Sequence, residues 1–287
     1  MRDFSHGLAH LSINTATLRK QLALPTMIEA CARRGIARIC PWRDQVDAAG
    51  LKSVARQLGH IGIKLSGYCR GGFFPAADAA GLKAALADNR RAIEEAKSLG
   101  APCLIMVVGA LPGALSGQPA HKDIGLARAQ VVAGLAASLD YARSLAMPLA
   151  IEPLHPMQAA DRACVNTLEQ ALDICDALDP DRSGAVGVAV DVYHTWWDPK
   201  LEGQIARAGP ERLLAYHVCD WLLPTRDLLN DRGMMGDGIV ELQKIRGWIE
   251  AAGYAGPAEV EIFSEHWWRL PAEEVLDACI ARYNTVV

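Results

Sequence analysis

Short apolar runs alternate along the chain with longer amphipathic stretches. Seven of the runs predict β-strands, at residues 10–18, 36–40, 63–72, 103–111, 186–195, 213–221 and 258–265. A further run, residues 149–151, lies between Pro148 and Pro153 and has no polar face, which predicts a strand buried on both sides. The intervening stretches predict helices at residues 25–34, 46–58, 79–99, 124–145, 167–178, 202–208, 240–252 and 272–283. Eight strands alternating with helices predict an α/β protein, a (β/α)8 TIM barrel.

The chain has 287 residues and no stretch that reads as a linker. This length fits one barrel, which typically takes about 250 residues, so we expect residues 1–287 to form a single domain. A doubly wound open sheet is the alternative. It is disfavoured because no GxGxxG follows the first predicted strand, where a dinucleotide fold would need it.

Charge and composition narrow the function classes. The net charge is -4 and the pI is about 6.1, without the basic stripe expected of a nucleic-acid surface. No stretch approaches the roughly 20 apolar residues of a membrane span, so we expect a cytoplasmic protein with no membrane partner. The eight cysteines form no CxxC pair and are expected to be reduced core residues.

Candidate metal ligands follow the last four predicted strands. Glu152, Asp191, His217 and Glu261 each stand at the carboxyl end of one strand. In a barrel these ends share one mouth, where enzymes of this fold place their chemistry. A single acid at a strand end is as often a helix cap or an arginine partner, but four in corresponding positions favour a metal site. Three carboxylates and an imidazole suit Mn²⁺, Mg²⁺ or Co²⁺, with Zn²⁺ also possible.

Several motifs give the chain a family resemblance. They are IEP at 151–153, DVYH at 191–194, HVCD at 217–220, GDG at 236–238 and VEIF at 260–263. With these the whole chain resembles the sugar isomerase/epimerase superfamily of xylose-isomerase-like barrels, whose members include ketose 3-epimerases and inosose dehydratases. The resemblance implies that the four residues named above hold one divalent metal, most often Mn²⁺. It also implies that Glu152 and Glu261 exchange a proton with a small sugar or polyol ketone, and that the protein forms a homo-dimer or tetramer.

Three further residues are candidates for substrate binding. His194 matches a substrate-contacting histidine of the family, although it could instead bond neighbouring loops. Arg226 lies in a loop where relatives often place an arginine, but an ion pair with Asp227 or Asp231 is nearly as plausible. His155 could act as an acid toward a leaving hydroxyl or only rim the pocket.

The reaction is predicted less narrowly than the fold. A metal-dependent isomerase or epimerase that moves a proton beside a carbonyl is the first hypothesis, and a metal-dependent dehydratase of an inosose or keto-sugar is the alternative. The EPLHPM sequence at 152–157 departs from ketose 3-epimerases, and no phosphate cradle is evident. A nuclease of the endonuclease IV type would need extra histidine ligands and a basic face, and a barrel that has lost activity would not need intact ligands.

Overall fold

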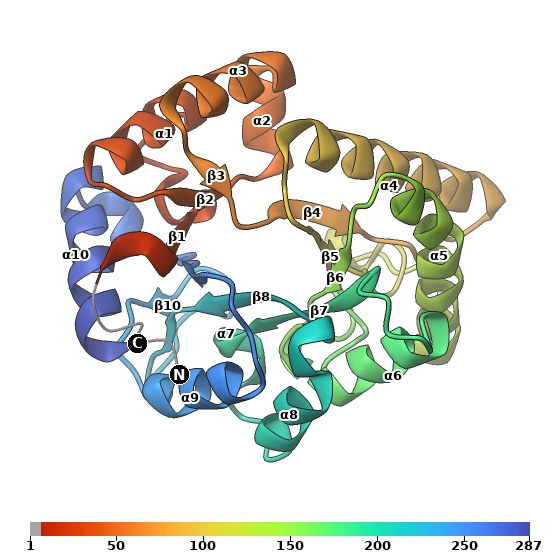
Figure 1. The fold of residues 1–287 in the computed structure, drawn as a ribbon. Coiled ribbons are helices and arrows are strands. Elements are labelled where there is room, and N and C mark those ends of the chain that lie inside the picture. Colours follow the sequence, from red (N-terminus) through yellow and green to blue (C-terminus); the bar gives the residue numbers. More distant parts are fainter. Residues whose placement is uncertain (1–6) are drawn as a thin grey trace.

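A barrel of parallel strands inside a ring of helices forms the body of the protein (Figure 1). The structure is a computed structural model that describes residues 7–287. The barrel strands are β1 (Leu11–Asn14), β2 (Arg38–Cys40), β3 (Lys64–Leu65), β4 (Tyr68–Gly72), β5 (Leu104–Val107), β6 (Leu149–Ile151), β7 (Val186–Asp191), β8 (Leu213–Val218) and β11 (Ala258–Val260). The helices are α1 (Leu24–Arg33), α2 (Arg43–Ala49), α3 (Leu51–Ile61), α4 (Ala79–Leu99), α5 (Ile124–Ser144), α6 (Leu168–Leu178), α7 (Val192–Thr195), α8 (Leu201–Arg212), α9 (Leu242–Ala251) and α10 (Ala272–Val286). The predicted (β/α)8 TIM barrel is confirmed.

The strands follow one another around the barrel in the order β3-β2-β1-β11-β8-β7-β6-β5-β4. β3 and β4 are two pieces of the single third strand that the sequence predicts, separated at Ser66 and Gly67. The two ends of the sheet meet where the Cys69 N–H donates to the Pro41 carbonyl, at 3.0 Å. This contact brings β4 beside β2, so the strands occupy eight positions around a nearly closed barrel.

Two strands end earlier than their apolar patterns predict. In each, a polar side chain accepts a hydrogen bond from the backbone N–H two residues further along the chain. Asn14 accepts a hydrogen bond from the Ala16 N–H and begins a 3-10 turn, η2 (Thr15–Leu18). Asp191 accepts one from the Tyr193 N–H at 2.8 Å and begins α7. Side chains of this kind commonly replace a strand by a turn or helix start. Both residues therefore sit at the mouth of the barrel.

The helices match the predicted ranges closely, with one exception. The predicted helix at 46–58 is two helices, α2 and α3, divided at Gly50. Gly50 has φ 82°, a conformation that glycine adopts without the steric cost of a Cβ atom. Thr167 caps α6, because its side chain accepts a hydrogen bond from the Gln170 N–H. The outer ring is therefore built largely from signals visible in the sequence.

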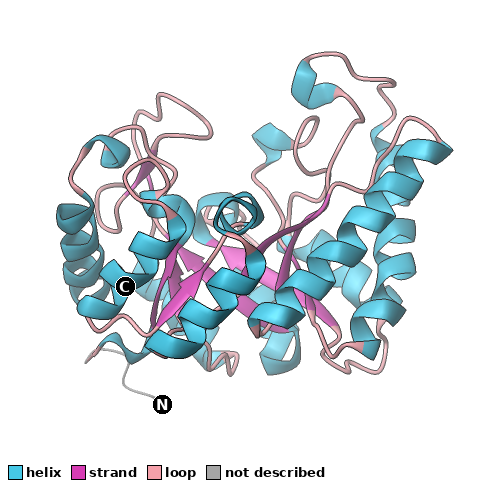
Figure 2. Ribbon diagram, turned by 90° about the horizontal axis from the view of Figure 1, so that it is seen from above, coloured by secondary structure: helices cyan, strands magenta, loops and turns pink. Residues whose placement is uncertain are grey.

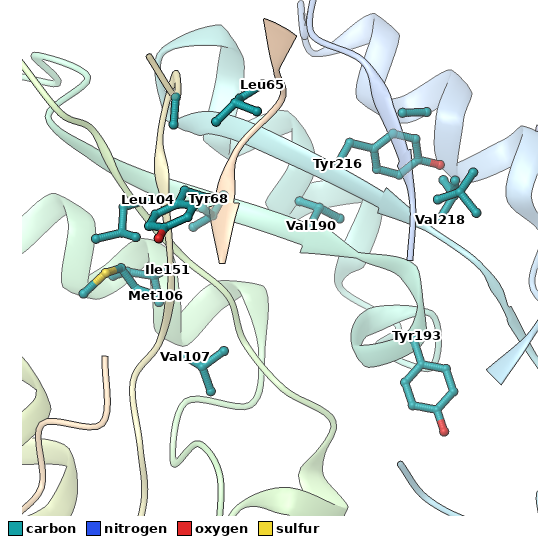
Figure 3. Packing of buried hydrophobic residues seen from close by; sticks show 14 of the residues in the cluster. Leu65, Tyr68, Leu104, Met106, Val107, Ile151, Val190, Tyr193, Tyr216 and Val218 are labelled. Atoms are coloured by element: carbon teal, nitrogen blue, oxygen red, sulfur yellow. The ribbon is translucent and has the colours of Figure 1, made fainter. Parts of the chain in front are cut away.

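Side chains alternate between the two faces of the barrel wall. Leu104, Met106, Ile151, Val190 and Val218 belong to the large apolar core that packs with the helices (Figure 3). The residues between them contribute to a second, smaller cluster made of Cys40, Cys69, Cys103, Ile105, Ala150, Ala189 and Ala215. Most members of this inner set are small, which leaves room inside the barrel for polar groups. All eight cysteines are buried and unpaired, in agreement with the sequence prediction.

A fully buried arginine ties three outer elements together. Arg212, at the end of α8, donates from Nη1 to Asp179 Oδ2 and to the Val186 carbonyl, both at 2.7 Å. Its Nη2 donates to the Cys175 carbonyl at 3.3 Å and to the Asp179 carbonyl. These bonds join α8 to the end of α6 and to the start of β7.

The long connections lie at one end of the barrel, above the carboxyl ends of the strands (Figure 2). They follow β5, β6 and β8, and the last one contains a small antiparallel pair, β9 (Asp220–Trp221) with β10 (Arg232–Gly233). Within residues 7–287, no helix has both the length and the apolar character needed to cross a bilayer.

Candidate functional site

Four buried side chains meet at the carboxyl ends of neighbouring strands. Glu152, Asp191, His217 and Glu261 each come two residues after an inward-facing position, so the alternation of the strands directs them inward as well. Asp191 and His217 are direct partners in the register of β7 and β8. Each of the four offers one ligand atom, and these atoms all lie within 4.8 Å of one another. The structure therefore brings the four predicted ligands together.

The cluster has the features of a cation site. His217 Nδ1 lies 3.0 Å from Glu152 Oε1 and 3.8 Å from Glu261 Oε2. Despite this closeness, Glu152 Oε1 and His217 Nδ1 are buried and neither has a hydrogen-bond partner. Buried polar atoms are rarely left unpaired, so two that face a common centre point to a missing partner. Three carboxylates and one imidazole nitrogen are a donor set that fits a divalent metal.

Burial and mutual repulsion perturb the acids of the cluster. Burial raises the pKa of Glu261 to about 8, and the negative charges of Glu152 and Asp191 act in the same direction. Burial alone would also raise the pKa of Asp191, but the neighbouring Arg232 guanidinium holds it below the usual value. The carboxylates around His217 raise the pKa of this histidine well above the ordinary value, although burial acts in the opposite direction. Repulsion of this kind is relieved by a bound cation.

Arg232 is a site residue that the sequence did not predict. It comes from β10 and is buried, and its Nη1 donates to Asp191 Oδ2 at 2.7 Å and to Glu261 Oε2 at 3.2 Å. Arg226, the arginine expected in this loop, is exposed and pairs with Asp231 instead, which is the other reading of its position. Both arginines belong to one loop, and only the pairing of β9 with β10 distinguishes them.

A second unpredicted residue lies below the cluster. Glu259 Oε1 is 3.5 Å from His217 Nε2, the ring nitrogen that faces away from the other carboxylates. Glu259 also accepts hydrogen bonds from Asn14 Nδ2 at 2.8 Å and Ser66 Oγ at 2.6 Å. A carboxylate behind a ligating histidine fixes its tautomer and ring orientation. The available signal was its position two residues before Glu261, on the same face of β11.

The two histidines expected near the substrate differ in placement. His194 is buried in the cavity wall, and its Nδ1 accepts a hydrogen bond from the His155 N–H at 3.1 Å. Its Nε2 lies 3.6 Å from Asp191 Oδ2 and 3.2 Å from Arg232 Nη2, a nitrogen that can only donate a hydrogen bond. Burial lowers the pKa of His194 to about 3 despite the Asp191 charge, so the ring is neutral at pH 7. The His155 ring stacks on Trp221 at 4.9 Å and does not line the cavity.

The cluster opens into a cavity of about 790 Å³. Glu152 and Glu261 line this cavity, whereas Asp191 and His217 are fully buried beneath it. Trp42 and Arg43 follow β2, Arg70 belongs to β4, and all three form part of the cavity wall. After β11, Phe263 and Trp268 line the cavity, and Trp268 Nε1 donates to the Ala16 carbonyl at 2.9 Å. A cavity of this size accommodates a small molecule.

Comparisons with known proteins agree with this geometry. The inosose isomerase of Halalkalibacterium halodurans is 25% identical over 206 residues, which cover 71% of this chain and 68% of that protein. The crystal structure of protein SMc04130 from Sinorhizobium meliloti 1021 is 56% identical with a TM-score of 0.92, covering 98% of this chain and 99% of the other. A crystal structure of the IOLI protein with a bound zinc atom is 22% identical with a TM-score of 0.81, covering 97% and 98%. The last likeness shows the shared fold.

Residues 27–282 match the family model described as the xylose isomerase-like TIM barrel. This match covers most of the chain, and it includes all four residues of the buried cluster. The resemblance drawn from the sequence motifs is confirmed, and the chain belongs to the xylose isomerase-like TIM barrel family.

Proposed function

We propose that this protein is a divalent-metal-dependent isomerase or epimerase that moves a proton beside the carbonyl of a small sugar or polyol ketone. The observation that carries the proposal is the division of the cluster by the cavity. Only Glu152 and Glu261 line the cavity, while Asp191 and His217 lie beneath it with no exposed surface. Two carboxylates that reach one substrate are what a proton transfer between its two faces requires.

Glu152, Asp191, His217 and Glu261 would hold the metal. When bound, a divalent ion supplies positive charge that stabilises an enediolate formed from the substrate. The fit rests on the unpaired Glu152 Oε1 and His217 Nδ1, and the zinc in the related IOLI structure is consistent with a divalent ion. Mn²⁺ is our first choice, with Mg²⁺, Co²⁺ or Zn²⁺ as the other candidates.

The chain's own groups are placed for the proton transfer. Glu152 lines the cavity, so the oxygen of its carboxylate that does not hold the metal can accept a proton from a substrate carbon. Glu261 Oε2 is oriented by Arg232, and it is the second group that can return a proton. His194 presents its imidazole ring and Arg232 its guanidinium to the same part of the cavity, where they can bind substrate oxygens.

The placement of His155 favours proton movement over loss of water. Dehydration needs an acid that protonates the leaving hydroxyl, and His155 was the residue with that possible role. Its ring lies against Trp221, and its Nδ1 accepts a hydrogen bond from the Met157 N–H at 3.3 Å. We therefore place the dehydratase second. The named activity of the curated relatives, inosose isomerase, supports the same order.

Hydrogen exchange in heavy water tests the proposal. The purified protein with MnCl₂ is incubated with a panel of free ketoses and inososes, and NMR follows deuterium at carbons beside the carbonyl. We expect exchange that a chelator abolishes and that Glu152→Gln and Glu261→Gln each reduce by at least about 100-fold, since each removes a base with little change in volume. Both variants keep His217, so each differs from the wild type only in the carboxylate that is replaced. Full activity in either glutamine variant would rule out the two-carboxylate mechanism, and a new unsaturated product would favour the dehydratase.

Two further expectations accompany the proposal. We expect a dimer or tetramer of identical chains in the cytoplasm, without nucleic-acid or membrane partners. Light scattering coupled to size exclusion measures the first of these directly. A monomer at micromolar concentration would contradict it.

A further inference from the structure

Three of the six lysines and arginines in the cavity wall are already paired with carboxylates. Arg19 pairs with Asp44, and Arg43 pairs with Asp88 and Glu95. Arg232 pairs with the acids of the buried cluster. The carboxylates of the protein therefore largely neutralise the charges of these arginines before any ligand enters.

Arg70 and Arg162 differ from these arginines. Both line the cavity, and within residues 7–287 neither has a carboxylate within ion-pair distance or a side-chain hydrogen bond. Arg70 is partly buried and its guanidinium carbon lies 4.1 Å from the ring centre of Phe73 and 5.9 Å from that of Trp42. The two rings fix the guanidinium plane while leaving its N–H groups without partners. A partly buried guanidinium without an acceptor is costly, unless a ligand supplies one.

The two arginines act on the same part of the cavity. Arg70 lies within β4, and Arg162 lies in the loop after β6, which packs on the β5 loop through the Cys164 N–H bond to the Gly109 carbonyl. The positive charge of Arg162 adds to burial in lowering the pKa of Arg70, so the two guanidiniums repel one another. Around the barrel, β4 lies opposite β8, the strand that carries His217. Arg70 therefore faces the cavity from the side opposite His217, whereas Arg162 reaches it from the loop that begins at Glu152.

A buried amide adds a second, independent signal at this place. Gln158 lines the cavity and is only 5% exposed, yet its Oε1 has no hydrogen-bond partner. The backbone carbonyl of Gln158 accepts a hydrogen bond from the backbone N–H of Arg162 at 3.1 Å, so the two residues belong to one turn of the loop. An unpaired buried acceptor beside unpaired donors matches a ligand that has both an anionic group and hydroxyls.

We infer that Arg70, Arg162 and Gln158 form an anion subsite, and that the substrate is an acidic keto-sugar with a carboxylate or phosphate ester remote from the reacting carbon. This inference rests on the proposed function, because the reacting end is assigned to Glu152 and Glu261. Guanidinium groups bind carboxylate and phosphate in the same bidentate manner. The anionic group would lie at Arg70 and Arg162, and a neighbouring hydroxyl would donate to Gln158.

Binding and exchange are measured separately to test the subsite. Glucuronate, glucose 6-phosphate and neutral glucose serve as binding probes by calorimetry, and these distinguish the carboxylate from the phosphate. Arg70→Met and Arg162→Met remove one charge each and keep an apolar stem. Lys20→Met, an unpaired cation at the exposed rim of the same cavity, is the matched control. Arg70→Lys retains charge without the planar fork.

The wild-type protein should bind one anionic probe at least about 10-fold more tightly than glucose. Arg70→Met and Arg162→Met should each weaken that binding about 10- to 100-fold, while Lys20→Met leaves it within about twofold. Equal binding of all three probes, or loss of binding in the Lys20 control alone, would overturn the subsite. Arg162→Met decides the matter if Arg70→Met does not fold.

Exchange on paired substrates separates the two proposals. In heavy water, fructose is compared with its 6-phosphate and with the corresponding 5-keto acid. Preference for an anionic member, lost in Arg162→Met, supports the subsite. Selective anion binding without exchange on any substrate would refute the proposed function alone. Exchange on fructose with no preference for either anion would refute the subsite alone.

Discussion

Replacing Glu259 by glutamine tests whether this residue positions a metal ligand. Gln keeps the shape of the side chain and removes its charge. The amide oxygen can still accept from Asn14 Nδ2, and Ser66 Oγ can turn to donate to Ser12 Oγ, which lies 2.7 Å away. The fold should therefore tolerate the change. What is lost is the negative charge 3.5 Å from His217 Nε2.

The size of the effect follows from that distance. Coulomb's law with an effective dielectric constant of about 20 gives roughly 5 kcal/mol for two full charges at this separation, which is an upper limit. Carboxylates behind ligating histidines typically contribute 10- to 100-fold to metal affinity, or about 1.4–2.7 kcal/mol. We therefore expect Glu259→Gln to weaken Mn²⁺ binding by about 10- to 100-fold.

Calorimetric titration with MnCl₂, supported by competition with a chelator, measures this affinity. Glu265→Gln is the matched control, because Glu265 lies exposed in the cavity wall and its loss removes the same net charge. A folded Glu259→Gln protein that bound Mn²⁺ within twofold of the wild type would refute the positioning role. An equal loss in both variants would assign the effect to overall charge.

Three other predictions concern stability. Arg212→Met should lower the free energy of unfolding by about 3–5 kcal/mol, because it leaves the buried Asp179 carboxylate without its main partner. In thermal denaturation the Tm should fall by roughly 6–20 °C. Arg207→Met, at the surface, is the control and should change little. Burial alone would raise the pKa of Asp179, but hydrogen bonds from Ser183 and Arg212 hold this pKa below 3.8. The ionised Asp179 therefore stabilises the folded protein above pH 3.8, and this stabilisation is lost as the pH falls through the pKa of Asp179 in the folded state. Asp179→Asn should therefore flatten the acid side of the stability curve measured by denaturant titration, and an unchanged slope would contradict this. MnCl₂ at 100 times its Kd should stabilise the wild type by about 2.7 kcal/mol, and Asp191→Asn, which keeps the cap on Tyr193, should lose that shift.

The sequence predicted the fold and the core of the candidate site because both depend on local periodicity. A strand of period two places Glu152 beside Ala150 and Asp191 beside Ala189 on the inner face, whatever the rest of the chain does. The four clustered ligands follow from applying this rule to neighbouring strands. Strand ends were harder, because the side chains of Asn14 and Asp191 bond backbone two residues ahead and stop the strand where the apolar pattern continues.

Arg232 and Glu259 were missed for a different reason. Their roles depend on partners far away in the chain. Arg232 reaches Asp191 across 41 residues because β9 and β10 pair inside an irregular loop that has no periodic signal. Glu259 meets Asn14 across 245 residues, in a network that forms only when the barrel closes. Contacts of this kind come from tertiary structure, which a single sequence does not expose.

The contacts of Arg232 with the acids of the cluster affect whether the barrel can fold before an ion binds. A site built only from carboxylates would resist assembly until an ion arrived to hold them together. Here the chain carries an internal counter-ion that touches Asp191 and Glu261 from one side. These acids can therefore assemble, and the barrel can close, without a bound ion. Under the proposed function, a metal ion would then bind to a barrel that is already folded.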